Sequence, residues 1–247
     1  YKEDKSKWAD FLPKLIGLKP AKTIGMNHLL KNIASAKNNP KIEGIFLQGG
    51  SLSAGYGELK ELRDALIDFK KSGKFVLAYA DNYTQSNYYL ASVANKVLIN
   101  PFGSVDLKGL ASRTTYYKNV IDKLGIEMQI VKVGTYKSAV EPFTSTHMSD
   151  YNREQVSVFL NSIWNNICSE MATTRQLPVD SINELANAYA ALLPTDQVRQ
   201  RKLVDKLIYE DQTDSLLNSY MLNGMKAVKL DHNYFNKKNR KSIKNQN

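Results

Sequence analysis

Cysteine and histidine are scarce in this sequence of 247 residues, and their scarcity excludes several kinds of site. A single cysteine, Cys168, excludes an internal disulfide and any metal site built from several cysteines. It lies among apolar residues at helical spacing, which indicates a buried hydrophobic side chain rather than a nucleophile. The three histidines, His28, His147 and His232, are scattered, and no HExxH pair is present to hold zinc. We therefore expect neither a metal ion nor any other cofactor.

Long apolar runs are also lacking. No segment reaches the roughly 18 uninterrupted apolar residues typical of a membrane-spanning helix, and the first residues do not resemble a signal peptide. The chain begins with Tyr1 rather than methionine and ends in a basic segment, which suggests a piece of a longer protein. We expect the chain itself to be soluble, and any membrane anchor to lie outside it.

Positive charge, by contrast, is abundant: the net charge is +10, from 34 basic and 24 acidic residues. Five of the basic residues belong to the final segment KKNRKSIKNQN, which has no acidic residue, so the rest of the chain is only mildly basic. No motif of the common DNA- or RNA-binding modules accompanies this charge. The sequence therefore predicts no nucleic-acid partner, and a solvated basic linker over residues 236–247.

Predicted helices and strands alternate along the first half of the chain. A helix over residues 23–38, capped by Thr23, precedes a buried strand that ends in a glycine turn at Gly49 and Gly50. The same patterns predict later helices and strands. They are helices over 55–74, 86–95 and 115–125, strands over 75–80, 96–100 and 127–133, and a turn at PFG. This alternation predicts a layered α/β fold with a mostly parallel sheet.

The character of the chain changes beyond Pro142. Apolar residues at helical spacing predict one long amphipathic helix, and shorter helices are expected over residues 182–191 and 196–207. The apolar residues of the long helix are Val156, Phe159, Leu160, Ile163, Ile167 and Met171. We divide the chain into an N-terminal lead-in (1–22), an α/β core domain (23–150), a helical extension of that domain (151–235) and the basic linker (236–247).

The glycine turn from Gly49 to Gly57 is one candidate for chemistry, because it follows a strand and opens a helix. Backbone N–H groups in such a turn can hold an anion or an oxyanion. The turn matches neither the P-loop nor the dinucleotide-binding pattern, so a tight strand-to-helix connection is the simpler interpretation.

The segment VGTYKSAVEPF contains a stronger candidate, Lys137. The residues before it, QIVKV, are apolar enough to form a strand that ends in the interior, and Gly134 lets the backbone turn sharply. A lysine in water has a pKa near 10.4; burial that lowers this value by about 3 units takes roughly 4 kcal/mol and yields a neutral amine. Such an amine could accept a proton from a serine hydroxyl. Most lysines are solvated surface charges, and the pattern alone leaves that alternative open.

Three segments of the sequence resemble one protein family. They are VGTYKSAVEPFTSTHMS, YYLASVANKVLINPFGSVDLKGL and KLVDKLIYED. Together they resemble the amino-terminal half of the signal peptide peptidase A family, the long-form bacterial protease IV, over residues 24 to 211. The resemblance implies a Clp protease/crotonase-like fold of repeated ββα units, with a helical C-terminal extension. It also implies a membrane-associated serine endopeptidase that degrades cleaved signal peptides with a Ser/Lys dyad, in which Lys137 is the general base.

By the same resemblance, the serine of the dyad belongs to a C-terminal half that is absent from this chain. The internal similarity of the two halves places the nucleophile position at Gln85, whose amide cannot attack a carbonyl. Ser86 is one residue away at the start of a helix, so its side chain points about 100° away from that position. We therefore expect a half-site, and expect this fragment alone to be inactive.

Four further residues are expected to shape the site rather than to react. Gly49 and Gly50 match strand-end glycines that help to form the family's oxyanion site. Gly134 and Ser138 flank Lys137, and the hydroxyl of Ser138 could hydrogen-bond around the lysine. Ser51 lies in the glycine turn, and we interpret it as a structural residue of the turn before a helix rather than as a reactive serine.

The resemblance also implies partners and a location. The expected partners are signal peptides and other extended apolar peptides, the C-terminal half of the same protein, and further copies of the chain in a homo-oligomer. The expected location is the bacterial inner membrane, facing the periplasm, through an anchor outside this chain.

Two other functions remain open. A scaffold domain could use the long helix, Tyr151 to Arg175, as a contact face between copies that enclose a chamber. A crotonase-like acyl-CoA enzyme follows from the shared fold alone, and the absence of a carboxylate pair near the glycine turn argues against it.

Overall fold

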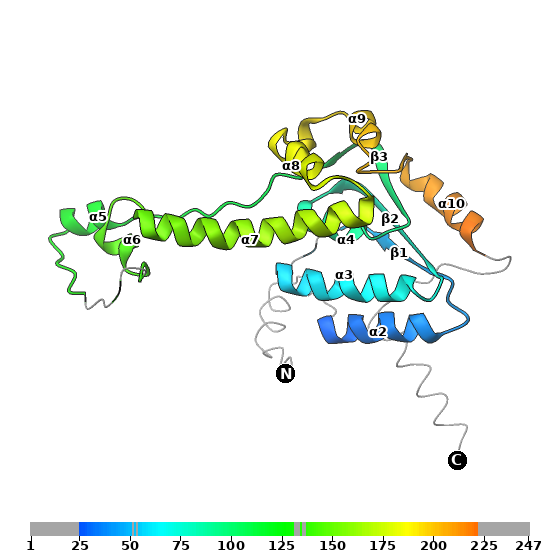
Figure 1. Ribbon diagram of the computed structural model, residues 1–247, viewed down its shortest axis with the longest axis horizontal. Helices are drawn as coiled ribbons and strands as arrows, with labels where there is room; N and C mark the ends of the chain where they lie inside the picture. Colours follow the sequence, from blue (N-terminus) through cyan, green and yellow to red (C-terminus); the bar gives the residue numbers. More distant parts are fainter. Residues whose placement is uncertain (1–24, 51, 53, 131–133, 135–136, 222–247) are drawn as a thin grey trace, which may run out of the picture.

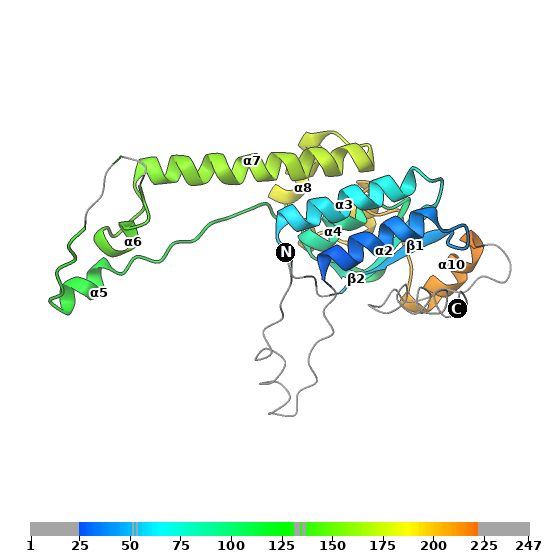
Figure 2. The same cartoon turned by 90° about the horizontal axis from the view of Figure 1, so that it is seen from below.

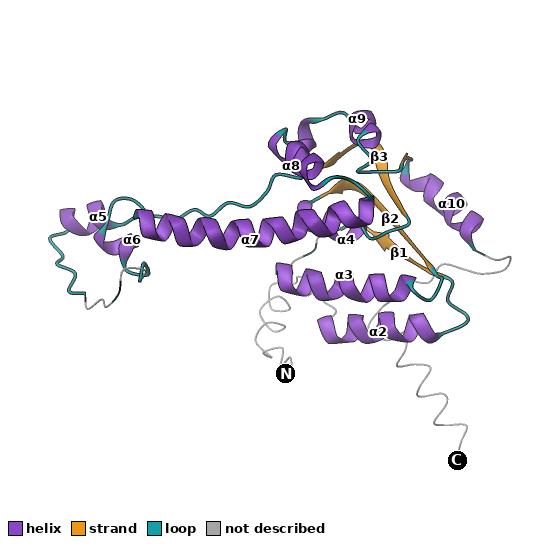
Figure 3. Ribbon diagram, viewed as in Figure 1, coloured by secondary structure: helices purple, strands orange, loops and turns teal. Residues whose placement is uncertain are grey.

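The computed structural model describes residues 25–50, 52, 54–130, 134 and 137–221 (Figure 1). Among these residues, a four-stranded sheet is accompanied by helices (Figure 3). In chain order the elements are α2 (Met26–Asn38), β1 (Gly44–Gln48), α3 (Tyr56–Lys70), β2 (Phe75–Tyr83), α4 (Gln85–Ala91), β3 (Lys96–Val105), α5 (Lys118–Lys123), α6 (Glu141–Thr144), α7 (Asp150–Arg175), α8 (Val179–Asn187), η1 (Ala190–Leu192), α9 (Thr195–Gln200), β4 (Lys206–Leu207), η2 (Glu210–Gln212) and α10 (Thr213–Tyr220).

Every strand pair of this sheet is parallel, and the spatial order β1-β2-β3-β4 follows the order in the chain. Parallel neighbours need a crossover connection, and α3 and α4 supply the first two. The predicted mixed α/β fold with a parallel sheet is therefore confirmed. The repeated ββα units, the helical C-terminal extension and the domain boundaries stay predictions.

The main core lies between the sheet and the helices. Residues of β2 alternate between the two faces of the sheet, as the pleat requires. Val76, Ala78 and Ala80 belong to the main core together with the apolar faces of α2, α3, α4, α8 and α9 and the last turns of α7. Tyr79 belongs to a smaller cluster on the opposite face, against which Leu216 of α10 packs.

Strand β3 differs from its prediction, because the segment PFG lies inside the strand rather than after it. The pairing of β2 with β3 passes from Ala80↔Ile99 to Asn82↔Ser104, so several residues of β3 bulge opposite Asp81. Glycine is required in this bulge because a Cβ atom on Gly103 would lie 1.9 Å from the carbonyl oxygen of Asp81. A bulge is also one of the few places in a sheet that accepts proline, here Pro101.

Two other local predictions were wrong. The first described helix begins at Met26 with Gly25 as its N-cap, and Thr23 lies outside the described residues. The predicted strand over 127–133 is not formed at residues 127–130, which are irregular, and Met128 among them is 44% exposed. An apolar segment forms a buried strand only where a sheet receives it, and this segment lies far from the sheet (Figure 1).

Helix α7 carries the chain away from the core. Its last turns contribute Ile167, Cys168, Met171 and Ala172 to the core, whereas its first half extends beyond it (Figures 1 and 2). An irregular segment runs out alongside α7 to α5, and α6 lies near the start of α7. We call the described residues 111–130, 134 and 137–162 the arm. Within the arm, Glu141 and Asn152 are the only buried residues among those described.

Candidate active site

Lys137 lies at the far end of the arm, away from the sheet. It is exposed and precedes α6, where the backbone N–H of Glu141 donates to the carbonyl oxygen of Ser138 over 3.0 Å. Gly134, on the other side of Lys137, has a φ of +102°, a backbone conformation that favours glycine. The sequence predicted Lys137 near the buried end of a strand, whereas in the structure it is exposed in an irregular segment of the arm.

A small polar junction fixes the geometry of this tip, and sequence reasoning missed it. The buried carboxylate of Glu141 accepts hydrogen bonds from the Ser149 hydroxyl (2.5 Å) and from the Asn152 side-chain amide (2.8 Å). The Ser149 hydroxyl in turn accepts from the Asn152 backbone N–H and caps α7. The segment SDYN carries a serine N-cap signal that could have located the helix start, but nothing local indicates the contact with Glu141.

A ring contact holds α5 to α6. The Tyr117 and Phe143 rings stack with centroids 6.1 Å apart, and the Tyr117 backbone N–H donates to the Pro142 carbonyl oxygen over 2.6 Å. Lys137 is therefore presented beside a locally ordered helix pair rather than at the end of a bare loop.

The glycine turn lies at the other candidate location, the carboxyl end of β1. The Gly49 backbone N–H donates to the Tyr79 carbonyl oxygen of β2 over 2.6 Å, and a Cβ atom on Gly49 would lie 2.4 Å from that of Ala80. Gly49 is thus needed for close approach of two strands. The carbonyl oxygen of Gly50 accepts from the Asn87 side-chain amide of α4 over 2.6 Å.

Gln85, at the position expected for the nucleophile, is buried and fully engaged. Its amide nitrogen donates to the Tyr56 hydroxyl (2.9 Å) and to the Gly109 carbonyl oxygen (3.1 Å). Its amide oxygen accepts from the backbone N–H groups of Lys108 and Gly109, both over 3.0 Å. Two adjacent backbone N–H groups directed at one carbonyl oxygen have the form of an oxyanion hole, and here the protein's own side chain fills it.

The other predicted site residues are divided between these two locations. Ser86 is half-buried at the start of α4, Ser138 is half-buried next to Lys137, and Ser51 lies outside the described residues. The fold thus brings together the glycine turn, Gln85 and the segment at Lys108 and Gly109, and it holds Lys137 apart from them.

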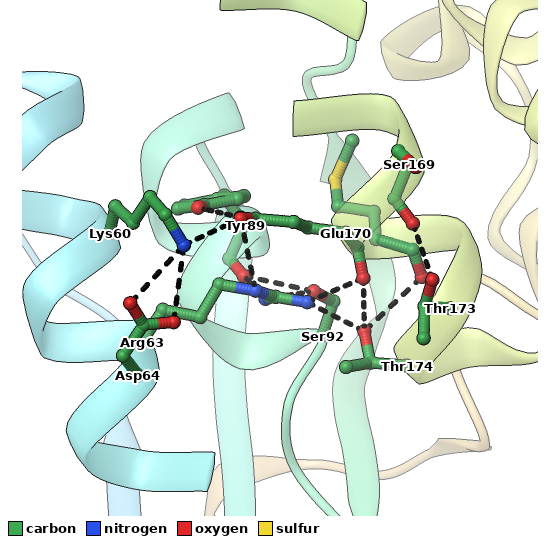
Figure 4. A network of polar contacts seen from close by, with 10 residues as sticks. Lys60, Arg63, Asp64, Tyr89, Ser92, Ser169, Glu170, Thr173 and Thr174 are labelled. Carbon is green, nitrogen blue, oxygen red and sulfur yellow. Dashed lines mark hydrogen bonds and ion pairs between the residues drawn. The ribbon is translucent and has the colours of Figure 1, made fainter. Parts of the chain in front are cut away.

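A second polar network joins α3, α4 and α7, and Figure 4 shows its side chains. The guanidinium of Arg63, which is fully buried, donates to the Ser92 hydroxyl (2.8 Å), the Thr174 hydroxyl (2.7 Å) and the Glu170 carbonyl oxygen (2.7 Å). It also donates to the Tyr89 carbonyl oxygen and lies over the Tyr89 ring, 4.7 Å from its centroid. We call this network the Arg63 clamp; it fixes the root of α7.

The carboxylate of Glu170 completes the Arg63 clamp. Its oxygens accept from the Lys60 ammonium over 2.8 Å and from the Tyr89 hydroxyl, and one lies 3.7 Å from Nε of Arg63. Burial alone would raise the pKa of Glu170, but the hydrogen bonds from Lys60 and Tyr89 hold it below its ordinary value. Burial lowers the pKa of Arg63.

Cys168 has the buried setting that the sequence predicted. It is fully enclosed in the core, and burial raises the pKa of its thiol to about 12, which keeps it protonated and unreactive. Over the described ranges, no helix is long and apolar enough to cross a membrane. In the same part of the chain, no group of three or more His, Cys, Asp or Glu side chains is placed to hold a metal ion.

Comparison with known proteins gives this geometry a family context. The pattern of peptidase family S49 matches residues 68–221. The chain is 35% identical over 229 residues to Protease 4 of Haemophilus influenzae, covering 88% of this chain and 37% of that protein. It is 40% identical over 150 residues to Protease 4 of Salmonella typhi, covering 60% of this chain and 24% of that protein.

A plant protein is also similar. The chain is 27% identical over 194 residues to the chloroplastic serine protease SPPA of Arabidopsis thaliana, covering 78% of this chain and 28% of that protein. The chain thus spans 37% or less of the length of these three relatives.

Proposed function

Because the chain belongs to peptidase family S49, we propose that it supplies the general-base lysine, Lys137, of a serine endopeptidase of the signal peptide peptidase type. The nucleophilic serine would lie in a part of the protein that this chain does not contain. One observation supports the proposal: Lys137 is exposed in the arm, while buried Gln85 lies in the core at the position that the resemblance gives to the nucleophile. An exposed lysine that lies away from the core is accessible to a serine on another part of the protein.

In the proposed reaction the serine hydroxyl attacks the scissile carbonyl as the neutral lysine amine removes its proton. The resulting ammonium then donates that proton to the leaving amine, and water hydrolyses the acyl-enzyme. A lysine is neutral near pH 7 only when it is removed from water, which takes roughly 4 kcal/mol for a lowering of the pKa by about 3 units. In this proposal, docking of the serine-bearing half onto the arm tip provides that burial.

Substrates in this proposal are extended apolar peptides, including signal peptides released during secretion. The relatives named Protease 4 and SPPA support the protease class. The intact protein would lie at the bacterial inner membrane and face the periplasm, through an anchor outside the chain.

A fluorophosphonate probe, which labels activated serines, tests the half-site directly. The full-length protein and the 247-residue chain are treated in parallel and read by intact mass. We expect labelling of the full-length protein alone. In the full-length protein, Lys137→Ala should abolish labelling and peptide hydrolysis, whereas Lys123→Ala, at another lysine of the arm, should change neither. Labelling of the 247-residue chain would show that it carries its own nucleophile, and peptide mapping would then identify it.

A scaffold role is a second proposal, and the exposed apolar residues of α7 favour it. Val158 and Phe159 are 64% and 63% exposed and, with Glu154 and Gln155, line a shallow groove on the arm. We propose that this face contacts another copy of the chain in the assembled protease. The Lys137→Ala variant separates the two proposals, because a domain that serves only as a scaffold predicts retained hydrolysis.

A further inference from the structure

A basic pocket lies on the opposite side of the core from the arm. It has a volume of about 510 Å³ and lies between the end of α3, the last residues of α7 and the segment after α9. Its lining includes four cationic side chains, Lys70, Arg175, Arg199 and Lys202, and one carboxylate, Asp205. Strand β3 starts beside it, since Asp205 accepts from the Val97 backbone N–H. The pocket is therefore at the amino ends of the strands, whereas the glycine turn is at a carboxyl end.

The Asp205 carboxylate of the pocket already accepts hydrogen bonds from the protein itself. One oxygen of Asp205 accepts from the Val97 backbone N–H (2.7 Å) and from the Arg175 guanidinium (3.0 Å). Arg175 directs further N–H groups at the Lys202 carbonyl oxygen, over 2.8 and 3.1 Å. This pair balances one of the four positive charges that line the pocket, and Asp196 balances a second by pairing with Arg199 over 3.2 Å.

The remaining groups are rich in donors and poor in acceptors. The Lys70 ammonium donates one hydrogen bond, to the Val93 carbonyl oxygen over 2.6 Å. Its other two N–H groups can therefore donate to a ligand. The side-chain oxygen of Asn95 accepts from the Val76 backbone N–H over 2.8 Å, so its amide nitrogen is the end left for a ligand. Among the described residues, neither Lys70 nor Lys202 has a carboxylate within ion-pair distance.

The like charges in this region oppose one another. Burial, followed by repulsion from Arg175 and Arg63, lowers the pKa of Lys70. A bound anion would relieve this repulsion, and a tetrahedral oxyanion offers several acceptor oxygens to such donors.

We propose that this pocket is an anion site for a phosphate group, held by Lys70, Lys202 and Asn95, which line it together with the Arg175–Asp205 pair. The site is independent of the proposed protease activity, because it lies at the C-terminal end of α7 and the arm tip lies at the other end (Figure 1). Its ligand is either a soluble phosphate compound or the phosphate of a lipid headgroup, since the two offer the same oxygens to the pocket.

Titration calorimetry with inorganic phosphate at low ionic strength tests the site. We expect saturable binding to the 247-residue chain that weakens as sodium chloride is added. The double variant Lys70→Gln/Lys202→Gln should bind at least about tenfold more weakly, and Lys71→Gln, exposed at the end of the same helix and outside the pocket, should stay within about twofold of wild type. Thermal unfolding without phosphate establishes that the variants are folded.

Vesicle flotation distinguishes the two sources of phosphate. Binding to phosphatidylglycerol vesicles that is lost in the double variant and competed by inorganic phosphate would identify a headgroup site. Phosphate binding without vesicle binding would identify a soluble phosphate compound. The proposal is overturned if phosphate does not bind, or if the double variant and Lys71→Gln bind it as well as the wild type.

Discussion

The core and the arm use the same kinds of side chain in opposite ways. In the core, Leu66 and Phe69 are fully buried, whereas in the arm Val158 and Phe159 are more than half exposed. The core also holds buried polar groups in hydrogen-bond networks around Arg63 and Gln85. The core thus encloses its apolar side chains at these positions, whereas the described part of the arm leaves Val158, Phe159 and Lys137 exposed.

Matched substitutions of phenylalanine give the largest expected contrast. Phe69→Ala leaves a cavity between α3 and the sheet and should lower the free energy of unfolding by about 3–5 kcal/mol. Phe159→Ala removes a ring that is already 63% exposed and should change it by less than about 0.5 kcal/mol. Urea denaturation of both variants measures the difference. A large loss from Phe159→Ala would mean that the arm packs against part of this same chain.

The Arg63 clamp comes next in expected effect. Arg63→Ala would leave the Glu170 carboxylate without its buried cation and the acceptors on α4 and α7 without their donor, so we expect a loss of about 3 kcal/mol. Lys60→Ala removes an exposed partner of the same carboxylate and should cost less than about 1 kcal/mol. Thermal or urea unfolding of both variants tests this order. Equal losses would contradict this order, because they would show that the buried guanidinium contributes no more than the exposed ammonium of Lys60.

The Gln85→Ala variant tests whether the hydrogen bonds of this buried amide stabilise the core. Gln85→Ala leaves the Lys108 and Gly109 backbone N–H groups without their acceptor and should cost about 1–3 kcal/mol. Ser86→Ala, one residue along, should stay within about 0.5 kcal/mol of wild type. Amide hydrogen exchange at Lys108 and Gly109 should accelerate in the first variant alone. Unchanged exchange would show that Gln85 does not hold this segment.

The smallest effect concerns pH. The pKa of Glu170 is lower in the folded chain than its ordinary value of 4.5, so its contribution to stability is fully present above that value. It is lost as the pH falls through the lower, folded-state pKa. The difference in unfolding free energy between wild type and Glu170→Gln should therefore be constant from about pH 7 to 6 and shrink below about pH 4.5. A difference that grows on acidification would contradict this assignment.

The sequence predicted the core better than the arm, for a physical reason. Helix α3 and strand β2 carry periodic apolar residues that local patterns reveal, and Cys168 was correctly expected to be buried. The segment after Gly125 is also apolar, yet it lies where no sheet receives it. Local pattern cannot distinguish an apolar residue that packs into the core from one that the fold leaves exposed.

The polar networks were hidden for a different reason. Arg63 looks like an ordinary exposed helix residue in the sequence, and its hydrogen-bond partners are 26 to 111 residues away. The engagement of Gln85 with Tyr56 and Gly109 depends in the same way on three segments that only the fold brings together. The resemblance placed Gln85 at the nucleophile position, but it did not indicate that the side chain closes a hole of backbone N–H groups.

Strand β4 is synthesised long after β3, the strand with which it pairs. Strand β4 pairs with β3, as Leu98↔Lys206 and Ile99↔Leu207, across an interval of roughly 100 residues that includes the whole arm. At a synthesis rate of about 5–20 residues per second, the edge of β3 waits about 5–20 s for its neighbour. During that interval the nascent chain exposes an unpaired strand edge, a template for aggregation that persists after the arm is complete and until β4 emerges.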